Sequence, residues 1–280
     1  MTAALSITPS LQPRPFLKWA GGKGRLLSQY EPFLPMAIDT YYEPFLGGGA
    51  VFFYLVGRIR RAVLGDINPE LVNVYCCVRD DVEALIRHLR HHQRWHSPDY
   101  YYHVRQQRAL PTAIERAARL IYLNKTCYNG LYRENSQGHF NVPVGNYKNP
   151  AICDASLLRT ASAALQIAEI QTFSFDKLAE RSLSPRDFVY FDPPYHPISS
   201  TSSFTGYSRH GFTGADQERL AQLFRTLAAQ GQRVMLSNSD CELIRELYRG
   251  FTQHPILAAR AINSRAGRRG KISELLITSP

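Results

Sequence analysis

The chain has 280 residues, 44% of them hydrophobic, which is enough to bury a sizeable core. Its 33 Lys and Arg against 23 Asp and Glu give a net charge of +10, which favours a polyanionic partner, most simply nucleic acid. No apolar run approaches the roughly 20 residues of a membrane helix. The five cysteines contain no C-x-x-C pair, so we expect free thiols in a reducing cytoplasm rather than a disulfide framework.

The N-terminal part of the chain has the order of a nucleotide-binding unit. Residues 15–30 begin as a glycine-rich loop and continue as a helix, and residues 40–45 read as a strand that enters the glycine turn 46–49. A helix is expected over 50–59, and a second strand over 62–66 ends in an acid. This order is typical of a Rossmann-like site, although the turn lacks the G-x-G-x-x-G fingerprint.

The middle and C-terminal parts predict a sheet that is interrupted by an insertion. Residues 68–127 show mostly helical spacing of apolar residues, and residues 128–150 carry turn signals that favour a hairpin with long loops. A helix is expected over 214–230, with Thr213 as its N-cap. Further strands are expected at 168–175, 187–191, 233–237 and 274–278.

These elements predict an α/β protein with a parallel sheet. We assign residues 1–70 and 151–280 to a Rossmann-like core, and residues 71–150 to a helical and β-hairpin insertion. Because ligands bind beyond the carboxyl ends of the strands in such sheets, we expect the functional side chains there.

The stretch FDPPYH, residues 191–196, follows a short buried strand, and its two prolines stop that strand and stiffen the turn. An exocyclic amine of a nucleobase is a poor nucleophile because its lone pair is delocalised into the ring. Acceptors on both N–H bonds, here the Asp192 carboxylate and the Pro193 carbonyl, favour a localised lone pair, and a base can stack on Tyr195. A methyl donor held nearby completes an in-line transfer. The alternative is a rigid surface turn.

Three further features can be interpreted either as ligand-binding sites or as ordinary structural elements. The glycine turn after Glu43 lets a cofactor approach the backbone, or it is simply a tight turn. Asp66 suits the hydroxyls of a ribose, or it caps the helix that follows. The segment 18–23, KWAGGK, looks like a phosphate loop. However, Gly24 stands where Ser or Thr would hold magnesium, so we do not expect a nucleoside triphosphate site.

The expected hairpin is rich in side chains that suit DNA. Arginine can read guanine, asparagine can read adenine, and aromatic rings can stack on unpaired bases, but a polar surface hairpin has the same composition. Side chains of these kinds between 124 and 150 are Lys125, Tyr128, Asn129, Tyr132, Arg133, Asn135, Asn141, Tyr147 and Lys148.

Two basic clusters remain. Four histidines of one expected helix have no acid or cysteine at ligand spacing, so we expect a solvated helix face and no metal site. A basic run near the C-terminus either holds phosphates or is a plain loop. The histidines are His88, His91, His92 and His96, and the basic run contains Arg260, Arg265, Arg268, Arg269 and Lys271.

Together these motifs are far more specific than any one alone. In chain order they are PFLKWAGGK, EPFLGGGAVFF, GDIN, YNGLYR, GHFNVPVGNYK, FDPPY and SRAGRRGKISELL. Over 15–276 the chain resembles the Dam-type DNA adenine-N6 methyltransferases of the D12 class, in particular the GATC-specific subgroup. The resemblance implies a Rossmann-like, S-adenosyl-L-methionine-dependent methyltransferase core in which the insertion 71–150 is the target-recognition domain.

The resemblance also implies residue roles, with double-stranded DNA as the partner and no metal. The substrate is the adenine of GATC, flipped out of the duplex. Implied cofactor-binding residues are Trp19, Lys23, Glu43, Phe45, Gly47, Asp66, Phe175 and Asp192. Implied amine-activating residues are Asp192, Pro193 and Tyr195, and implied DNA-binding residues are Lys18, Tyr128, Asn129, Leu131, Arg133, Pro143 and Tyr147. We expect a monomer without a membrane segment, in the cytoplasm and associated with the nucleoid when bound to DNA.

Two alternatives stay open at this point. One is a methyltransferase that acts on RNA adenine or on protein glutamine, and the other is a non-catalytic DNA-binding relative. Asp192 at the head of DPPY favours adenine, because the glutamine enzymes carry Asn there. Lys125 replaces the arginine that is usual in this block, which softens a phosphate contact or the reading of a flanking base. The sequence carries no signal that distinguishes a member of a restriction-modification system from a methyltransferase without a restriction enzyme.

Overall fold

A computed structural model describes residues 12–197, 211–259 and 271–280, and a seven-stranded sheet runs through them in the order β3-β2-β1-β4-β5-β7-β6. Neighbouring strands from β3 to β5 are parallel, whereas β7 runs antiparallel to both β5 and β6. The predicted α/β class is therefore confirmed, but the sheet is not wholly parallel. The strands are β1 (Ile38–Glu43), β2 (Ile59–Asp66), β3 (Ala168–Thr172), β4 (Phe188–Phe191), β5 (Arg233–Ser239), β6 (Thr252–Ala259) and β7 (Lys271–Thr278).

The chain reverses its direction across the sheet between β1 and β4. From β1 it moves outward through β2 to β3, and it then returns to place β4 on the other side of β1. Ligands of open α/β sheets bind at such reversals, beyond the carboxyl ends of the strands. At those ends β1 carries Glu43, β2 carries Asp66, and β4 leads into Asp192.

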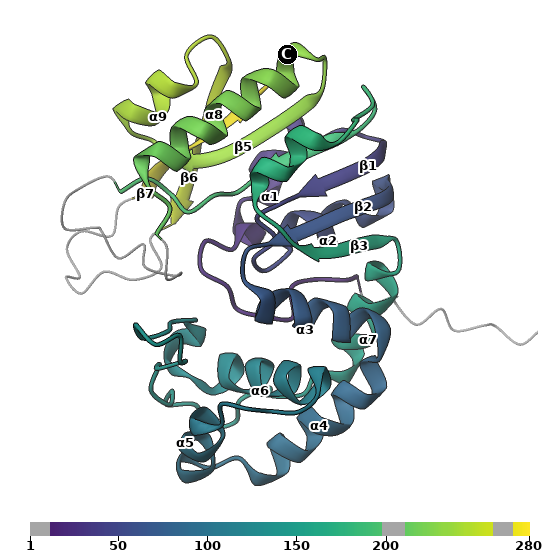
Figure 1. Cartoon of the computed structure of the whole chain (residues 1–280), viewed down its shortest axis with the longest axis vertical. Helices are drawn as coiled ribbons and strands as arrows, with labels where there is room; N and C mark the ends of the chain where they lie inside the picture. The colour runs from purple at the N-terminus through teal and green to yellow at the C-terminus, as the bar shows by residue number, and fades with distance from the viewer. Residues whose placement is uncertain (1–11, 198–210, 260–270) are drawn as a thin grey trace, which may run out of the picture.

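Side chains of alternate strand residues feed two hydrophobic cores on the two faces of the sheet. Tyr41 and Leu64 belong to the core that includes residues of α2, α3 and α7, whereas Tyr42 and Val63 belong to the core that includes residues of α8. Figure 1 shows α8 and α3 on opposite sides of the strands. The helices that flank the sheet are α1 (Leu27–Tyr30), α2 (Ala50–Leu55), α3 (Pro69–Asp80), α7 (Ala155–Leu165), α8 (Gly214–Ala229) and α9 (Glu242–Leu247).

Three helices between α3 and α7 lie beyond α3, away from the sheet (Figure 1). They are α4 (Val82–Trp95), α5 (Pro98–Gln106) and α6 (Ala113–Thr126). Residues of α5, α6 and the following loop form a third core in which Tyr101, Tyr122 and Val142 are buried. Helix α3 falls inside the expected insertion 71–150, yet it packs against β2 and β3 as well as against α6. The residue boundaries of the insertion stay a prediction.

The expected hairpin after α6 is present as a loop rather than as a regular two-stranded ribbon. Two isolated antiparallel bridges hold it, one between Cys127 and Val144 and the other between Glu134 and Phe140. A 3₁₀ turn, Tyr128–Gly130, lies directly after α6. The turn residues of this segment therefore outweigh its β-prone residues.

Other segments differ from the sequence-based expectation. Strand β6 was not predicted because Pro255 lies within it, but β6 is an edge strand of the described sheet and proline is tolerated there. The strand expected at 168–175 ends at Thr172, and Phe175 opens a 3₁₀ helix. The helix expected within 15–30 is reduced to short turns and to α1.

The histidines of α4 are not all solvated, which corrects the expected helix face. His92 Nδ1 lies 2.8 Å from the Tyr100 hydroxyl, and the His92 ring stacks on Tyr122. His96 Nδ1 lies 2.9 Å from the hydroxyl of Tyr122. Burial lowers the pKa of His92 to about 4, so this imidazole is neutral at physiological pH. The other two histidines are exposed as expected.

The described ranges contain neither a candidate metal site nor a helix that could cross a membrane. Within 12–197, 211–259 and 271–280, no three His, Cys, Asp or Glu side chains gather in a way that could hold a metal ion. No helix in the same ranges is long and apolar enough to cross a membrane. Of the basic run near the C-terminus, the side chains of Arg260, Arg265, Arg268, Arg269 and Lys271 lie outside the described part.

Thr213 confirms the expected cap of α8, and its replacement by alanine should destabilise the protein. The Thr213 hydroxyl accepts the Asp216 N–H, while the Asp216 carboxylate accepts the Thr213 N–H at 2.7 Å. We predict that Thr213→Ala lowers the free energy of unfolding by about 1 kcal/mol in urea denaturation. Thr213→Ser retains the hydroxyl and serves as the control. Equal stability of the two variants would contradict the capping role.

Candidate active site

Asp192 enters the site directly after β4 and is held by two neighbours. Its Oδ1 accepts the hydroxyl of Ser237 at 2.8 Å and lies 2.6 Å from Lys23 Nζ, whose side chain is only 3% exposed. Lys23 also donates to the carbonyl of Gly21 at 2.6 Å. Among the described residues, Asp192 Oδ2 accepts no hydrogen bond. The carboxylate is therefore fixed through one oxygen, while the other is available to a ligand.

Tyr195 stands next to this carboxylate and is fixed at its tip and at its ring face. Its hydroxyl donates to Glu274 Oε2 at 2.8 Å, and Lys23 Nζ lies 4.7 Å from its ring centroid. Burial, followed by the charge of Asp192, raises the pKa of Tyr195 well above its ordinary value. Burial also raises the pKa of Glu274. The phenol thus stays a neutral hydrogen-bond donor throughout the physiological range.

A buried polar network holds the two-proline turn in place. The Pro194 carbonyl accepts from Gln217 Nε2 at 3.0 Å, and Gln217 Oε1 accepts from Asn238 Nδ2 at 2.9 Å. Asn238 Oδ1 in turn accepts the His196 N–H at 3.1 Å. The Pro193 carbonyl accepts no hydrogen bond from the described residues, so it remains available beside Asp192.

Sequence reasoning missed Ser237, Asn238, Gln217 and Glu274. One signal was available for the first two, because LSNSD ends an otherwise apolar strand with polar residues that are fully buried. Buried polar groups need partners, so such a run indicates a site or a network. Gln217 and Glu274 reach the site through tertiary packing of α8 and β7. No local pattern marks Gln217, and Glu274 lies in the motif SRAGRRGKISELL without a predicted role.

The glycine turn after β1 packs against the N-terminal loop. Gly47 has φ of 47° and Gly49 has φ of 66°, which is the left-handed region that favours glycine. A Cβ atom at Gly47 would lie 2.9 Å from Cδ1 of Trp19. The Trp19 ring stacks on Tyr132 of the insertion at 5.1 Å between centroids. The turn therefore brings the core, the N-terminal loop and the insertion together.

Two acidic residues, Asp66 and Glu43, lie beside this turn, and they differ in their hydrogen bonds. Asp66 Oδ2 accepts the Gly47 N–H at 3.1 Å, and Asp66 Oδ1 accepts the Asn68 N–H at 3.0 Å. The helix cap that follows is Asn68 and not Asp66, so the capping alternative for Asp66 is wrong. Glu43 is 2% exposed, its Oε2 has no hydrogen-bond partner in the described part, and burial raises its pKa well above the ordinary value.

Phe45, which directly precedes the turn, forms an aromatic pair with Phe175. Their ring centroids are 5.6 Å apart in a stacked arrangement. Phe175 is buried, and the Arg219 guanidinium lies 5.4 Å from its ring centroid, whereas Phe45 is only half-buried. Phe45 is thus the more accessible of the two rings. The expected place of Phe175 near an adenine ring stays a prediction.

The expected DNA-facing residues fall into two groups around α6. Lys18 is joined to α6 by Asn124, whose side chain bonds both the N–H and the carbonyl of Lys18 at 2.9 and 2.7 Å. Lys18 Nζ reaches the hydroxyl of Tyr147 at 3.4 Å. Tyr128 is 54% exposed, and its N–H donates to the Pro143 carbonyl.

The second group lies farther along the loop. Arg133 is exposed, and its Nε donates to Asn141 Oδ1 at 2.7 Å, which aligns the guanidinium along the loop. Leu131 is half-buried. Asn129 is exposed, and its backbone adopts a left-handed φ of 55° within the turn. The structure thus gathers Asn129, Leu131 and Arg133 on the loop that follows α6.

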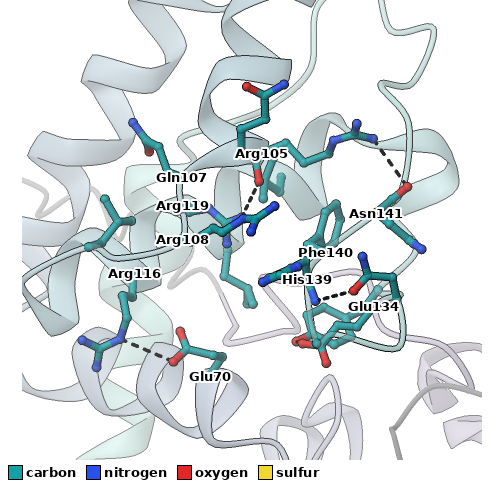
Figure 2. Close-up of a pocket in the computed structure, with 17 residues that line it drawn as sticks. Glu70, Arg105, Gln107, Arg108, Arg116, Arg119, Glu134, His139, Phe140 and Asn141 are labelled. Atoms are coloured by element: carbon teal, nitrogen blue, oxygen red, sulfur yellow. Dashed lines mark hydrogen bonds and ion pairs between the residues drawn. The ribbon is translucent and has the colours of Figure 1, made fainter.

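A basic cavity of about 390 Å³ lies between this loop, α5 and α6 (Figure 2). Arg119 donates to the carbonyls of Val104 and Arg105, and burial lowers its pKa. Arg108 is exposed and has no ion pair with a described residue, whereas Arg116 faces Glu70 at 3.4 Å. Sequence reasoning did not identify this cavity.

A family model that describes the D12 class N6 adenine-specific DNA methyltransferases matches residues 19–262. The chain belongs to this family. The type II methyltransferase M1.LlaDCHI of Lactococcus lactis subsp. cremoris is 43% identical over 95% of both chains. M.MjaIII of Methanocaldococcus jannaschii is 42% identical over 95% of this chain and 99% of its own length. The DNA adenine methylase of Haemophilus influenzae is 37% identical over 97% of this chain and 95% of its own length.

Membership of the D12 class decides between the alternatives that the sequence left open. The protein is an adenine-specific DNA methyltransferase, which is an enzyme and not a DNA-binding module alone. RNA adenine and protein glutamine are therefore not its substrate class. The polyanionic partner expected from the net charge of +10 is DNA.

Gly47 offers a test of the turn in this D12 enzyme. We predict that Gly47→Ala lowers the free energy of unfolding by roughly 1–3 kcal/mol, because alanine is strained at this φ and its Cβ meets Trp19. Gly24→Ala is the matched control, since no atom lies within 4 Å of a Cβ placed there. Chemical denaturation measures both variants. If Gly47→Ala unfolds like the control, the turn tolerates a side chain and the close approach is not required.

Proposed function

We propose that Asp192, Pro193 and Tyr195 form the site that activates the adenine N6 amine. The observation that carries this proposal is that Asp192 Oδ2 and the neighbouring Pro193 carbonyl accept no hydrogen bond from the described residues, on a turn held by Ser237 and Gln217. Two acceptors on the amine favour a tetrahedral nitrogen whose lone pair points at the methyl donor. Preorganised acceptors of this kind need no rearrangement at the moment of transfer.

S-adenosyl-L-methionine is the methyl donor that the family implies, and the residues at the turn fit it. Buried Glu43 Oε2, which has no hydrogen-bond partner among the described residues, suits the ammonium group of the methionine part, and the glycine turn leaves its backbone accessible. Asp66 lies at the end of β2, where an acid suits ribose hydroxyls. Trp19, Lys23, Phe45 and Phe175 complete the proposed binding set. When bound, the cofactor supplies an electrophilic methyl group on a sulfonium.

The chain itself contributes position and charge. Lys23 pairs with Asp192 Oδ1 at 2.6 Å, which leaves the second carboxylate oxygen to accept the hydrogen bond of the amine. Tyr195 offers a ring on which the adenine stacks. After transfer, the methylated amine is cationic and releases its proton without a dedicated strong base.

Target recognition is assigned to the insertion 71–150. An enzyme that acts on a base inside a duplex must flip it out, and we propose that Tyr128 fills the gap, which its exposed side chain supports. Lys18, Asn129, Leu131, Arg133, Pro143 and Tyr147 are proposed to contact a GATC site. The type II methyltransferases and DNA adenine methylases among the relatives support the class of target. The monomeric state and the cytoplasmic, nucleoid-associated location stay predictions.

Methyl transfer from labelled S-adenosylmethionine tests cofactor and target together. The substrates are a duplex with one GATC and a twin in which that site is scrambled. Label on the GATC adenine alone supports both proposals. Label on both duplexes retains the enzyme class and rejects the proposed specificity. An absence of label with intact, folded enzyme rejects the proposed cofactor or target.

Asp192→Ala should abolish methyl transfer while DNA still binds, because the variant loses an acceptor for the amine and the proposed DNA-binding residues lie elsewhere. Single-turnover transfer and fluorescence-anisotropy binding measure the two properties separately. Asp80→Ala is the matched control, since Asp80 is also an aspartate paired with a basic residue, Arg79, but lies on α3. Normal turnover by Asp192→Ala would refute the proposed mechanism.

Arg133→Ala should relax discrimination at one base pair of the target by roughly 1–3 kcal/mol, the range of a bidentate base contact. The measurement compares kcat/KM on GATC with kcat/KM on duplexes that carry single substitutions. Arg108→Ala removes an exposed arginine of the neighbouring cavity and should weaken all duplexes equally. Unchanged discrimination in Arg133→Ala would show that Arg133 does not read a base of the target.

A further inference from the structure

We infer that Glu274 is a positioning residue for the reaction, because it holds the Tyr195 ring in the orientation that receives the target adenine. The inference rests on the proposed role of Tyr195. Glu274 lies in the motif SRAGRRGKISELL, but the sequence analysis gave it no role, and the family match ends at residue 262, before it. The contact that assigns the role is the hydrogen bond from the Tyr195 hydroxyl to Glu274 Oε2 at 2.8 Å.

The sheet register explains how Glu274 reaches the site. Glu274 pairs with Ser239 of β5 across the antiparallel β5–β7 ladder. This pairing places Glu274 at the carboxyl end of β5, next to the strand end where Ser237 and Asn238 hold the two-proline turn. A strand that runs in the opposite direction thus supplies an acid to the edge of the sheet where the parallel strands end.

The Tyr195 ring is constrained at two points. Glu274 holds the hydroxyl at its tip, and the Lys23 ammonium lies 4.7 Å from its centroid. With only one of these contacts the ring could still rotate about that contact, whereas the two together define the plane of the ring. A base can stack well only on a ring whose plane is set before the base arrives, since ordering it later costs side-chain entropy.

The chemistry of the contact favours a carboxylate over a neutral acceptor. A phenol donates a stronger hydrogen bond to an ionised group than to a neutral one. Lys23, whose charge lowers the pKa of Glu274, opposes the effects of burial and of Asp192 that raise it. In the described part of the chain, Glu274 has no other hydrogen bond or ion pair from its side chain. Its one polar contact is therefore the one to Tyr195.

The test is a double-mutant cycle on the single-turnover rate of methyl transfer at saturating cofactor and DNA. We expect Glu274→Ala to slow transfer roughly tenfold to hundredfold, the factor for a hydrogen bond to a charged group. Glu274→Gln keeps a neutral acceptor and should restore part of the rate. Tyr195→Phe keeps the ring but loses the donor, so it should slow transfer by the same factor as Glu274→Ala. The double variant should be no slower than either single variant.

A second readout separates positioning from folding. A duplex with 2-aminopurine at the target position reports base stacking by fluorescence, and Glu274→Ala should raise the signal of the bound, flipped base because the ring no longer stacks well. Glu218→Ala, an exposed glutamate of α8, is the matched control and should change neither readout. The unfolding midpoint of each variant is measured alongside.

Several results would overturn the inference. Additive effects in the double variant would show that Glu274 acts independently of Tyr195. A loss in Glu274→Ala that follows the unfolding midpoint and is not rescued by Glu274→Gln would show a structural role. Tyr195→Ala distinguishes the inference from the proposed site. If Tyr195→Ala abolishes transfer while Glu274→Ala is normal, only the inference fails; if Tyr195→Ala is normal, the proposed site fails first.

Discussion

The buried ion pair between Lys23 and Asp192 is the contact on which the site depends. A charge that leaves water is costly unless it is paired and hydrogen-bonded, and here each partner satisfies the other at 2.6 Å. The pair joins the N-terminal loop to the turn after β4, and Ser237 extends the connection to β5. Three segments that are distant in sequence are therefore held at one point. Loss of either charge would leave the other uncompensated, so the two residues form a single unit.

The surroundings of this pair are unusually acidic for a site in a basic protein. Glu43, Asp192 and Glu274 lie around one ammonium group, and burial raises the pKa of the two glutamates. In this cluster three acids share one basic residue, Lys23, although the chain as a whole carries a net charge of +10.

Residues at the ends of parallel strands were the easiest to predict. Glu43, Asp66 and Asp192 each follow a short β-prone run, and the topology brings such ends to one edge of the sheet. Local pattern also identified the Thr213 cap and the glycine turn.

Glu274 and Gln217 were not predictable for a physical reason. Their roles depend on the register of β7 and on the packing of α8, which are set by tertiary contacts rather than by neighbouring residues. His92 was misassigned because helical periodicity does not show which second helix covers it. Strand β6 was missed because Pro255 is disfavoured in a central strand, and an edge position cannot be read from periodicity.

The order of the last strands bears on how the protein acquires its shape during synthesis. Strand β6 is made before β7, yet in the described sheet it is bonded only to β7, which lies between it and β5. While the ribosome is making the residues between β5 and β7, β5 presents an open edge and β6 has no neighbour. Glu274 arrives with the strand that closes this edge. A nascent chain stalled before β7 would therefore expose an aggregation-prone strand and lack the acid beside Tyr195.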